Sequence, residues 1–360
     1  MVKICSDTYS KNSEHFSKYN FELSSFQKYA IEAIDTGNHI LVTAHTGSGK
    51  TLPAEFAIEY FVGMGKKVIY TSPIKALSNQ KYYEFTKKFP HISFGILTGD
   101  IKSNPEADVL IMTTEILQNT LYKKRNKSEN NNLLMFEMDF DNELACVVFD
   151  EIHYINDPER GKVWEETIMM LPQHIQMVML SATLDSPEIF ASWCETRGLT
   201  SNPDKIVYLT TTHERVVPLT HYNFITTNNG IFKAIKDKTV QQEINNYIGK
   251  LHIIQGPKGE INEVNYHKMK KMTELFKNNH VHVKRQHVLN EVTQYMKDNN
   301  MLPALCFVLS RKQLEMAANE VTTVLLEDDS NVSYTIKYEC EQIIRKLPNY
   351  QEYLELPEYL

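Results

Sequence analysis

Cysteine pairs, long hydrophobic runs and secretion signals are missing from this sequence. Its cysteines form no C-x-x-C pair and lie far apart, at Cys5, Cys146, Cys194, Cys306 and Cys340. That spacing argues against a disulfide framework or a cysteine-based zinc site and favours reduced thiols inside a cell. No apolar stretch approaches the roughly 18 residues of a membrane span, and Met1 to Ser10 lack the apolar core of a signal peptide. We therefore expect an intracellular protein, cytoplasmic or nuclear, that is not secreted and has no membrane partner.

An excess of basic residues is also missing. Lys and Arg total 38 against 45 Asp and Glu, which gives a net charge of −7 over 360 residues. This balance excludes a uniformly basic protein that coats nucleic acid, but it is compatible with a local basic groove. The composition, 42% hydrophobic and 23% charged, is ordinary for a globular protein with a sizeable core. The length suggests two domains, or one large and one partial, and the surface balance predicts a monomer.

The most informative stretch is a loop of small residues between an apolar run and a helical pattern. Residues 39–43 are apolar and β-branched, as in a buried strand, and apolar residues recur at helical spacing over 54–62. The loop between them consists of Ala44, His45, Thr46, Gly47, Ser48, Gly49, Lys50 and Thr51. A strand, a loop and a helix start in this order aim unpaired backbone N–H groups and the positive end of the helix dipole at one point. The stretch therefore predicts a site for a phosphate chain.

Individual residues of this loop suit ATP and Mg²⁺. Gly47 and Gly49 allow the backbone to approach phosphates closely, Lys50 can reach the β- and γ-phosphates, and the Thr51 hydroxyl can ligate Mg²⁺. The usual pattern begins with glycine, and Ala44 stands in that place. The alternative is a glycine-rich turn that holds no ligand. We predict ATP and Mg²⁺ as the cofactors.

Further apolar runs alternate with helical stretches along the chain. The runs are residues 68–70, 94–97, 109–112, 145–149, 177–180 and 206–209. Nearly continuous apolar strands separated by helices predict a parallel sheet covered on both faces, with its chemistry at the carboxyl ends of the strands. A helix beginning near Phe26 precedes the first strand and carries Gln27. Its amide could read the edge of an adenine ring, although a helix-start glutamine that faces water is the alternative.

Two polar segments follow predicted strands. Asp150-Glu151-Ile152-His153 comes directly after 145–149, so Asp150 is expected to hold Mg²⁺, directly or through water, and Glu151 to orient or deprotonate the attacking water. The alternative is an ordinary polar turn after a strand. The second segment is Ser181-Ala182-Thr183. We expect it to hydrogen-bond to the His153 region and to couple the nucleotide state to the rest of the domain.

These motifs resemble those of superfamily 2 DExH-box RNA helicases, specifically the superkiller-like, exosome-associated group. The resemblance covers residues of about 21 to 225 and includes TSPIKALSNQK at 71–81, LTGD at 97–100, TTEIL at 113–117, and ERG and WEETI between 159 and 168. It implies a catalytic set of Lys50, Asp150, Glu151 and His153. It also implies a strand-binding groove that contacts the sugar-phosphate backbone through Pro73, Lys75, Gly99, Asp100, Thr113, Thr114 and Glu115. Backbone contacts carry no sequence information, which suits a motor that moves along any sequence.

The resemblance also implies a domain organisation. We expect an α/β fold with a RecA-like parallel sheet in residues 21–212, after an N-terminal extension at 1–20. A linker is expected at 213–300, and the start of a second, incomplete RecA-like domain at 301–360, where Pro303 to Lys312 resembles that domain's first strand and helix start. The Asn-rich stretch from Lys123 to Asp141 is interpreted as an exposed insertion.

The predicted function is that of an ATP-dependent RNA helicase core that binds single-stranded or structured RNA and, when complete, unwinds 3′ to 5′. RNA-degradation or RNA-processing factors are the implied partners. No match to the Gln-x-x-Gly-Arg-x-Gly-Arg motif, which carries the family's arginine fingers, occurs in these 360 residues. Such a finger contributes roughly 10³ to 10⁵ in rate, so slow turnover by this chain alone is expected. The alternatives are a DNA helicase or translocase of the same superfamily and a nucleotide-gated RNA-binding module.

Overall fold

The computed structural model describes residues 2–125, 138–197, 205–212, 215–228, 230–325, 330–346 and 351. The chain forms two compact units, which we call unit 1 (Met1–Val217) and unit 2 (Pro218–Leu360). No helix within the described ranges is both long and apolar enough to cross a membrane. All five cysteines are free thiols.

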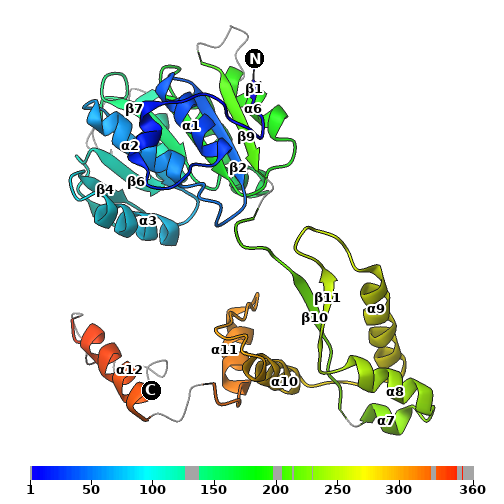
Figure 1. The fold of residues 1–360 in the computed structure, drawn as a ribbon. Coiled ribbons are helices and arrows are strands. Elements are labelled where there is room, and N and C mark those ends of the chain that lie inside the picture. Colours follow the sequence, from blue (N-terminus) through cyan, green and yellow to red (C-terminus); the bar gives the residue numbers. More distant parts are fainter. Residues whose placement is uncertain are drawn as a thin grey trace. The chain divides into compact units, whose positions relative to one another are not determined.

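The described part of unit 1 is built on one nine-stranded sheet (Figure 1). In spatial order its strands are β1 (Lys3–Ile4), β9 (Val207–Thr212), β2 (His39–Ala44), β8 (Gln176–Ser181), β7 (Leu144–Phe149), β3 (Lys67–Ser72), β6 (Val109–Thr113), β4 (Phe94–Leu97) and β5 (Lys102–Ser103). Neighbouring strands are parallel except β5, which runs antiparallel to β4. Every strand expected from the apolar runs between residues 39 and 209 is present.

Helices cover both faces of this sheet (Figure 1). One face packs against α1 (Ser25–Asp35), α2 (Leu52–Gly63) and α3 (Lys75–Lys88), and the other against α4 (Thr114–Arg125), α5 (Gly161–Met170) and α6 (Pro187–Thr196). Successive strand residues serve the two faces in turn: Ile40 and Val42 belong to the first core, and Leu41 belongs to the second. Strands buried on both faces explain the continuous apolar runs. The predicted RecA-like α/β fold is confirmed.

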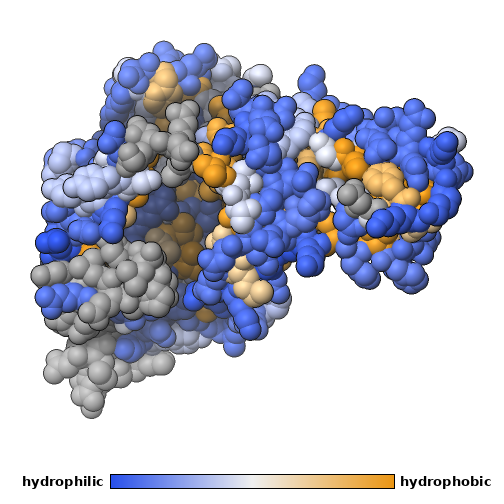
Figure 2. Space-filling view, turned by 90° about the horizontal axis from the view of Figure 1, so that it is seen from below, coloured by the Kyte–Doolittle hydropathy of each residue, from blue (hydrophilic) through white to orange (hydrophobic). Residues whose placement is uncertain are grey.

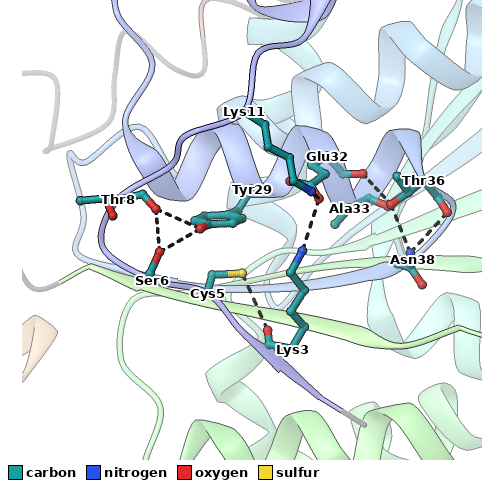
Figure 3. A network of polar contacts seen from close by, with 10 residues as sticks. All are labelled: Lys3, Cys5, Ser6, Thr8, Lys11, Tyr29, Glu32, Ala33, Thr36 and Asn38. Carbon is teal, nitrogen blue, oxygen red and sulfur yellow. Dashed lines mark hydrogen bonds and ion pairs between the residues drawn. The ribbon is translucent and has the colours of Figure 1, made fainter.

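The N-terminal segment, expected as an extension at 1–20, is part of unit 1. Strand β1 extends the sheet beside β9, with Lys3 opposite Tyr208. Figure 3 shows the segment lying along α1, where the Tyr29 hydroxyl donates to the Thr8 carbonyl at 2.9 Å. The Glu32 carboxylate accepts from Lys11 at 2.7 Å and Lys3 at 3.3 Å. Burial acts to raise the pKa of Glu32, but these hydrogen bonds outweigh it and hold that pKa below its ordinary value.

Unit 2 contains more regular structure than a linker. Strands β10 (His221–Phe224) and β11 (Leu251–Gln255) form an antiparallel pair. The helices in its described part are α7 (Gly230–Ala234), α8 (Lys238–Tyr247), α9 (Glu263–Asn278), α10 (Arg285–Asp298), α11 (Arg311–Glu320) and α12 (Ser330–Ile344). A small core joins α7, α8 and α9 through Ile231, Ile235, Ile244, Tyr247, Met272 and Phe276. The 213–300 stretch therefore includes a folded subdomain, and the division of the chain into motor domains and linker stays a prediction.

The strand expected at the beginning of the Pro303–Lys312 segment is not present. Residues 301–310 lie outside helices and strands, and Leu305, Phe307 and Leu309 are 85%, 87% and 107% exposed. A strand needs a neighbour to pair its backbone, and none lies beside this segment in the described part of unit 2. The predicted helix start is present, because Ser310 caps α11 by accepting from the Gln313 N–H at 3.4 Å.

Two surface features complete the fold. Most of the insertion predicted at 123–141, residues 126–137, lies outside the described residues. Its final part is not exposed as expected, because Phe140 is 2% exposed and packs in the second core. The face seen in Figure 2 is mostly hydrophilic, and hydrophobic side chains appear on it as separate patches.

Candidate nucleotide and nucleic-acid site

The sheet order brings the predicted site residues to one edge in two adjacent groups. Apart from Gln27, which lies in α1, the residues predicted to bind or sense the nucleotide lie at the ends of β2, β8 and β7, which are consecutive in the sheet. The residues predicted to contact nucleic acid follow β3, β6 and β4, which are the next three strands. Because all six strands are parallel, their carboxyl ends meet at the same edge.

The loop after β2 has the conformation that a phosphate cradle requires. Gly47 and Gly49 have φ of 85° and 86°, a region that favours glycine. An added Cβ at Gly49 would lie 2.7 Å from the Gln27 Nε2, so a larger residue here would also displace the Gln27 amide. Helix α2 begins at Leu52, immediately after Thr51. The positive end of its dipole therefore faces the loop, which fits a phosphate chain.

Gln27 links α1 to this loop. Its Oε1 accepts from the Ser24 N–H at 3.0 Å, and its Nε2 donates to the Gly49 carbonyl at 3.2 Å. The residue is 6% exposed, so the alternative of a glutamine that faces water is wrong. Both ends of the amide have partners within the protein, and recognition of adenine by Gln27 stays a prediction.

Lys50, Asp150 and Glu151 form a buried ionic cluster where β2 and β7 end. The Lys50 Nζ donates to the Glu151 Oε1 at 2.7 Å, and Lys50 and Asp150 are only 8% and 6% exposed. Asp150 accepts through Oδ2 from the Tyr70 hydroxyl at 2.6 Å and through Oδ1 from the Glu151 N–H at 3.0 Å. Burial raises the pKa of Asp150, the Glu151 charge adds to this, and the Tyr70 hydrogen bond opposes it.

The far side of Glu151 carries unsatisfied polar atoms. Glu151 has a left-handed backbone, with φ 50° and ψ 49°, which is uncommon for a non-glycine residue and turns the chain sharply after β7. Its Oε2 lies 3.3 Å from the His153 Nδ1, yet both atoms are buried without a hydrogen bond. Such atoms are costly unless a ligand or water satisfies them. An Mg²⁺–phosphate group with its attacking water fits this donor set.

The Ser181-Ala182-Thr183 segment follows β8, between the strands that carry Lys50 and Glu151. The Ser181 hydroxyl donates to the Thr183 carbonyl at 3.0 Å, within the segment itself. In the part of the chain that the structure describes, no hydrogen bond joins this segment to His153. Its coupling role stays a prediction.

Charges are paired within the predicted nucleic-acid groove. The Lys75 ammonium forms a salt bridge with Asp100, and an added Cβ at Gly99 would lie 3.3 Å from the Lys75 Nζ. Thr113 and Thr114 are buried. The structure therefore brings the residues after β3 and β4 into contact.

Two residues of the site were missed from sequence. Tyr70, which holds Asp150, reads as one more apolar position of a buried strand. Arg160, which forms a salt bridge with Glu115, lies in the ERG segment that carries part of the family resemblance. Glu115 is thus paired with a cation rather than facing the groove alone. The family resemblance of the Glu159-Arg160-Gly161 segment was the only sequence signal that could have identified Arg160. No sequence signal identified Tyr70.

The family model for DEAD/DEAH box helicases matches residues 24–190. This stretch is a DEAD/DEAH box helicase domain. It is 45% identical to the antiviral helicase SKI2 of Saccharomyces cerevisiae over 199 residues, which are 55% of this chain and 14% of SKI2. The chain is 34% identical to the human exosome RNA helicase MTR4 over 313 residues, 87% of this chain and 27% of MTR4. These relatives confirm the resemblance to the superkiller-like DExH group.

The matched part of the chain spans about a quarter or less of these two relatives. Among solved structures, the chain is similar to the helicase Lhr of Mycobacterium smegmatis bound to ssDNA and AMP-PNP. The match has a TM-score of 0.39 and 27% identity and covers 52% of this chain and 25% of Lhr.

Proposed function

We propose that the helicase domain binds ATP with Mg²⁺ and single-stranded RNA, as part of an ATP-dependent helicase that unwinds 3′ to 5′. The observation that carries the proposal is the buried Lys50–Glu151 ion pair, at 2.7 Å, beside the buried Asp150. A lysine at the end of a phosphate-binding loop, beside two carboxylates that follow β7, supplies the groups that phosphoryl transfer from a nucleoside triphosphate needs.

The geometry suggests how nucleotide binding prepares the site. The Lys50 ammonium is held by Glu151, so an incoming phosphate takes the place of the carboxylate as its partner. Glu151, freed from that ion pair, then orients or deprotonates the attacking water. Mg²⁺ held by Thr51 and Asp150 would neutralise charge on the phosphates. Backbone amides of the loop before α2 would bind phosphate oxygens, assisted by the positive end of the helix dipole.

RNA is the proposed nucleic acid because the relative MTR4 is named an exosome RNA helicase. The groove after β3, β6 and β4 is proposed to contact the sugar-phosphate backbone. RNA-degradation or RNA-processing factors are the proposed partners, in an intracellular setting. A monomer is proposed for the chain itself.

The test is steady-state ATP hydrolysis by the chain with and without single-stranded RNA, beside DNA of matched sequence. Because no arginine-finger motif occurs in this sequence, we expect hydrolysis by the chain to be slow, though stimulated by RNA. Glu151→Gln should lower it by about 100-fold or more, while ATP binding persists. The matched control is Glu22→Gln, because the Glu22 side chain is 92% exposed and its nearest cation, Lys28, is 3.9 Å away.

Three other results would change the proposal. Equal stimulation by DNA would favour a DNA translocase. RNA binding that depends on ATP without turnover would give a nucleotide-gated RNA-binding module. Absence of ATP binding by the unaltered chain would refute the nucleotide site itself.

A further inference from the structure

Arg160 joins three segments of the predicted nucleic-acid groove. Its Nη2 donates to the Pro73 carbonyl at 2.6 Å, in the loop that leads from β3 to α3. Its Nε donates to the Glu115 Oε1 at 3.1 Å, in the first turn of α4, and Nη2 also contacts that oxygen. One guanidinium therefore ties the turns after β3 and β6 to the start of α5.

A compact turn places Arg160 relative to the nucleotide cluster. The turn runs from Glu151 through the short 3₁₀ helix Ile152–Asn156 to α5. The Asp157 Oδ1 accepts from the Arg160 N–H at 2.8 Å. An added Cβ at Gly161 would lie 2.1 Å from the Ile155 carbonyl oxygen, so the close backbone approach requires glycine. The position of Arg160 is thus set by the same turn that begins at Glu151.

The charge of Arg160 is paired with groups of the protein itself. Its side chain is 37% exposed and that of Glu115 is 33% exposed. The guanidinium carbon also lies 5.6 Å from the centre of the Trp164 ring, a distance suited to a cation–π contact. The planar fork of arginine serves a carbonyl and a carboxylate from several N–H groups in a fixed arrangement, whereas all the donors of lysine lie on one nitrogen.

We propose that Arg160 is a positioning residue that holds the Pro73 turn and the first turn of α4 at fixed spacing for the nucleic-acid backbone. It does so from the segment that follows Asp150 and Glu151, without contacting phosphate itself. The nucleic-acid part of this inference rests on the proposed function. The ordering of the two turns does not, and it can be measured without RNA.

The experiment compares Arg160→Gln with Lys162→Gln. Lys162 is the matched control, because it lies two residues away, carries the same charge, is 79% exposed and contacts Glu166 within α5 at 3.3 Å. Amide hydrogen exchange is measured over residues 72–78 and 112–118. Single-stranded RNA affinity is measured at several salt concentrations, and ADP affinity is measured separately.

We expect Arg160→Gln to raise exchange in both segments and to weaken RNA binding, each by about tenfold, the scale of a lost charge-assisted hydrogen bond. The salt dependence of RNA binding and the ADP affinity should match those of Lys162→Gln. If Arg160 instead contacted phosphate, the salt slope would fall by about 0.7, and the positioning role would be refuted.

Other results also overturn the proposal. Unchanged exchange in both segments shows that Arg160 does not order them. Recovery of RNA affinity in the double variant Arg160→Gln/Glu115→Gln shows that Arg160 only neutralises the Glu115 charge. An equal loss of ADP affinity points to general damage of the domain. If the unaltered chain binds no RNA, the proposed function fails, and the exchange measurement still decides whether Arg160 orders the turns.

Discussion

Replacing Tyr70 by phenylalanine should weaken both the fold and the Mg²⁺ response of the nucleotide site. The Tyr70 hydroxyl donates to the Asp150 Oδ2 at 2.6 Å, with Tyr70 fully buried and Asp150 6% exposed. A hydrogen bond to a charged group contributes about 1.5–3 kcal/mol, and little solvent screening reduces it here. For about 2 kcal/mol, Tm should fall by about 4–8 °C in a domain of this size.

The loss should also change catalysis in a specific way. Without the phenol, one oxygen of the buried Asp150 carboxylate has no partner, so the orientation that receives Mg²⁺ is less populated. We expect the Mg²⁺ concentration for half-maximal hydrolysis to rise roughly tenfold, while saturating Mg²⁺ restores much of kcat.

The assay is ATP hydrolysis against Mg²⁺ concentration, combined with thermal melting. Tyr60→Phe is the matched control, since it removes a tyrosine–aspartate hydrogen bond, to the Asp35 Oδ1 at 3.1 Å, that is exposed and outside the site. If Tyr70→Phe and Tyr60→Phe gave the same Tm and the same Mg²⁺ dependence, the positioning of Asp150 by Tyr70 would be refuted.

Three further changes test other parts of the structure. Gly49→Ala places a Cβ 2.7 Å from the Gln27 Nε2 at a φ of 86°, so ADP affinity should fall at least about tenfold. The control is Gly65→Ala, where φ is 72° but no atom beyond the neighbouring residues lies within 4 Å of the added Cβ. This control should leave ADP affinity unchanged. Gln27→Ala should cost ATP more affinity than GTP if the amide reads adenine, and both equally if Gln27 only supports the loop. Burial, together with the Arg197 charge, lowers the pKa of His39. Below about pH 6.5 the unfolded chain therefore takes up a proton that the folded chain does not. As the pH falls through this range, the free energy of unfolding measured in urea titrations should fall by up to about 1.4 kcal/mol per pH unit. His39→Gln should flatten that slope.

The nucleotide half of the site was predictable because its residues are neighbours in sequence. Residues 44–51 combine strand, turn and helix signals in one continuous stretch, and the pair Asp150-Glu151 ends an apolar run. Local conformation and hydrophobic periodicity are enough to place both at the carboxyl ends of buried strands. The contact between Lys50 and Glu151 spans 101 positions, and only the sheet order, with β8 between β2 and β7, brings them together.

The parts that sequence did not predict depend on contacts between distant segments. Lys3 and Lys11 meet Glu32 only after β1 joins the sheet, so the N-terminal segment shows no local signal. In unit 2 the opposite error arises, because the apolar residues 303–309 have the composition of a buried strand, but they form no ladder with the described strands. An apolar, β-branched composition allows a segment to form a strand, but the strand forms only where a neighbouring strand is available for pairing.

The boundary between the two halves of the site lies between β7 and β3. Strand β7 ends in Asp150 and Glu151, and β3 ends in the turn that carries Pro73. The Asp150 N–H donates to the Thr71 carbonyl at 2.9 Å, and the Thr71 hydroxyl donates to the Val148 carbonyl at 3.1 Å, so the two strand ends are joined up to the last residue before the nucleotide cluster turns away. Tyr70 reaches across the same pair of strands to Asp150, and Arg160 reaches back to Pro73 from the segment after Glu151.

A displacement of Asp150 or Glu151 on nucleotide binding should therefore be transmitted to the turn that carries Pro73 through two independent contacts. Coupling through them is measurable as a difference in RNA affinity between the ATP-bound and ADP-bound chain, and the double variant Tyr70→Phe/Arg160→Gln should reduce that difference more than either change alone.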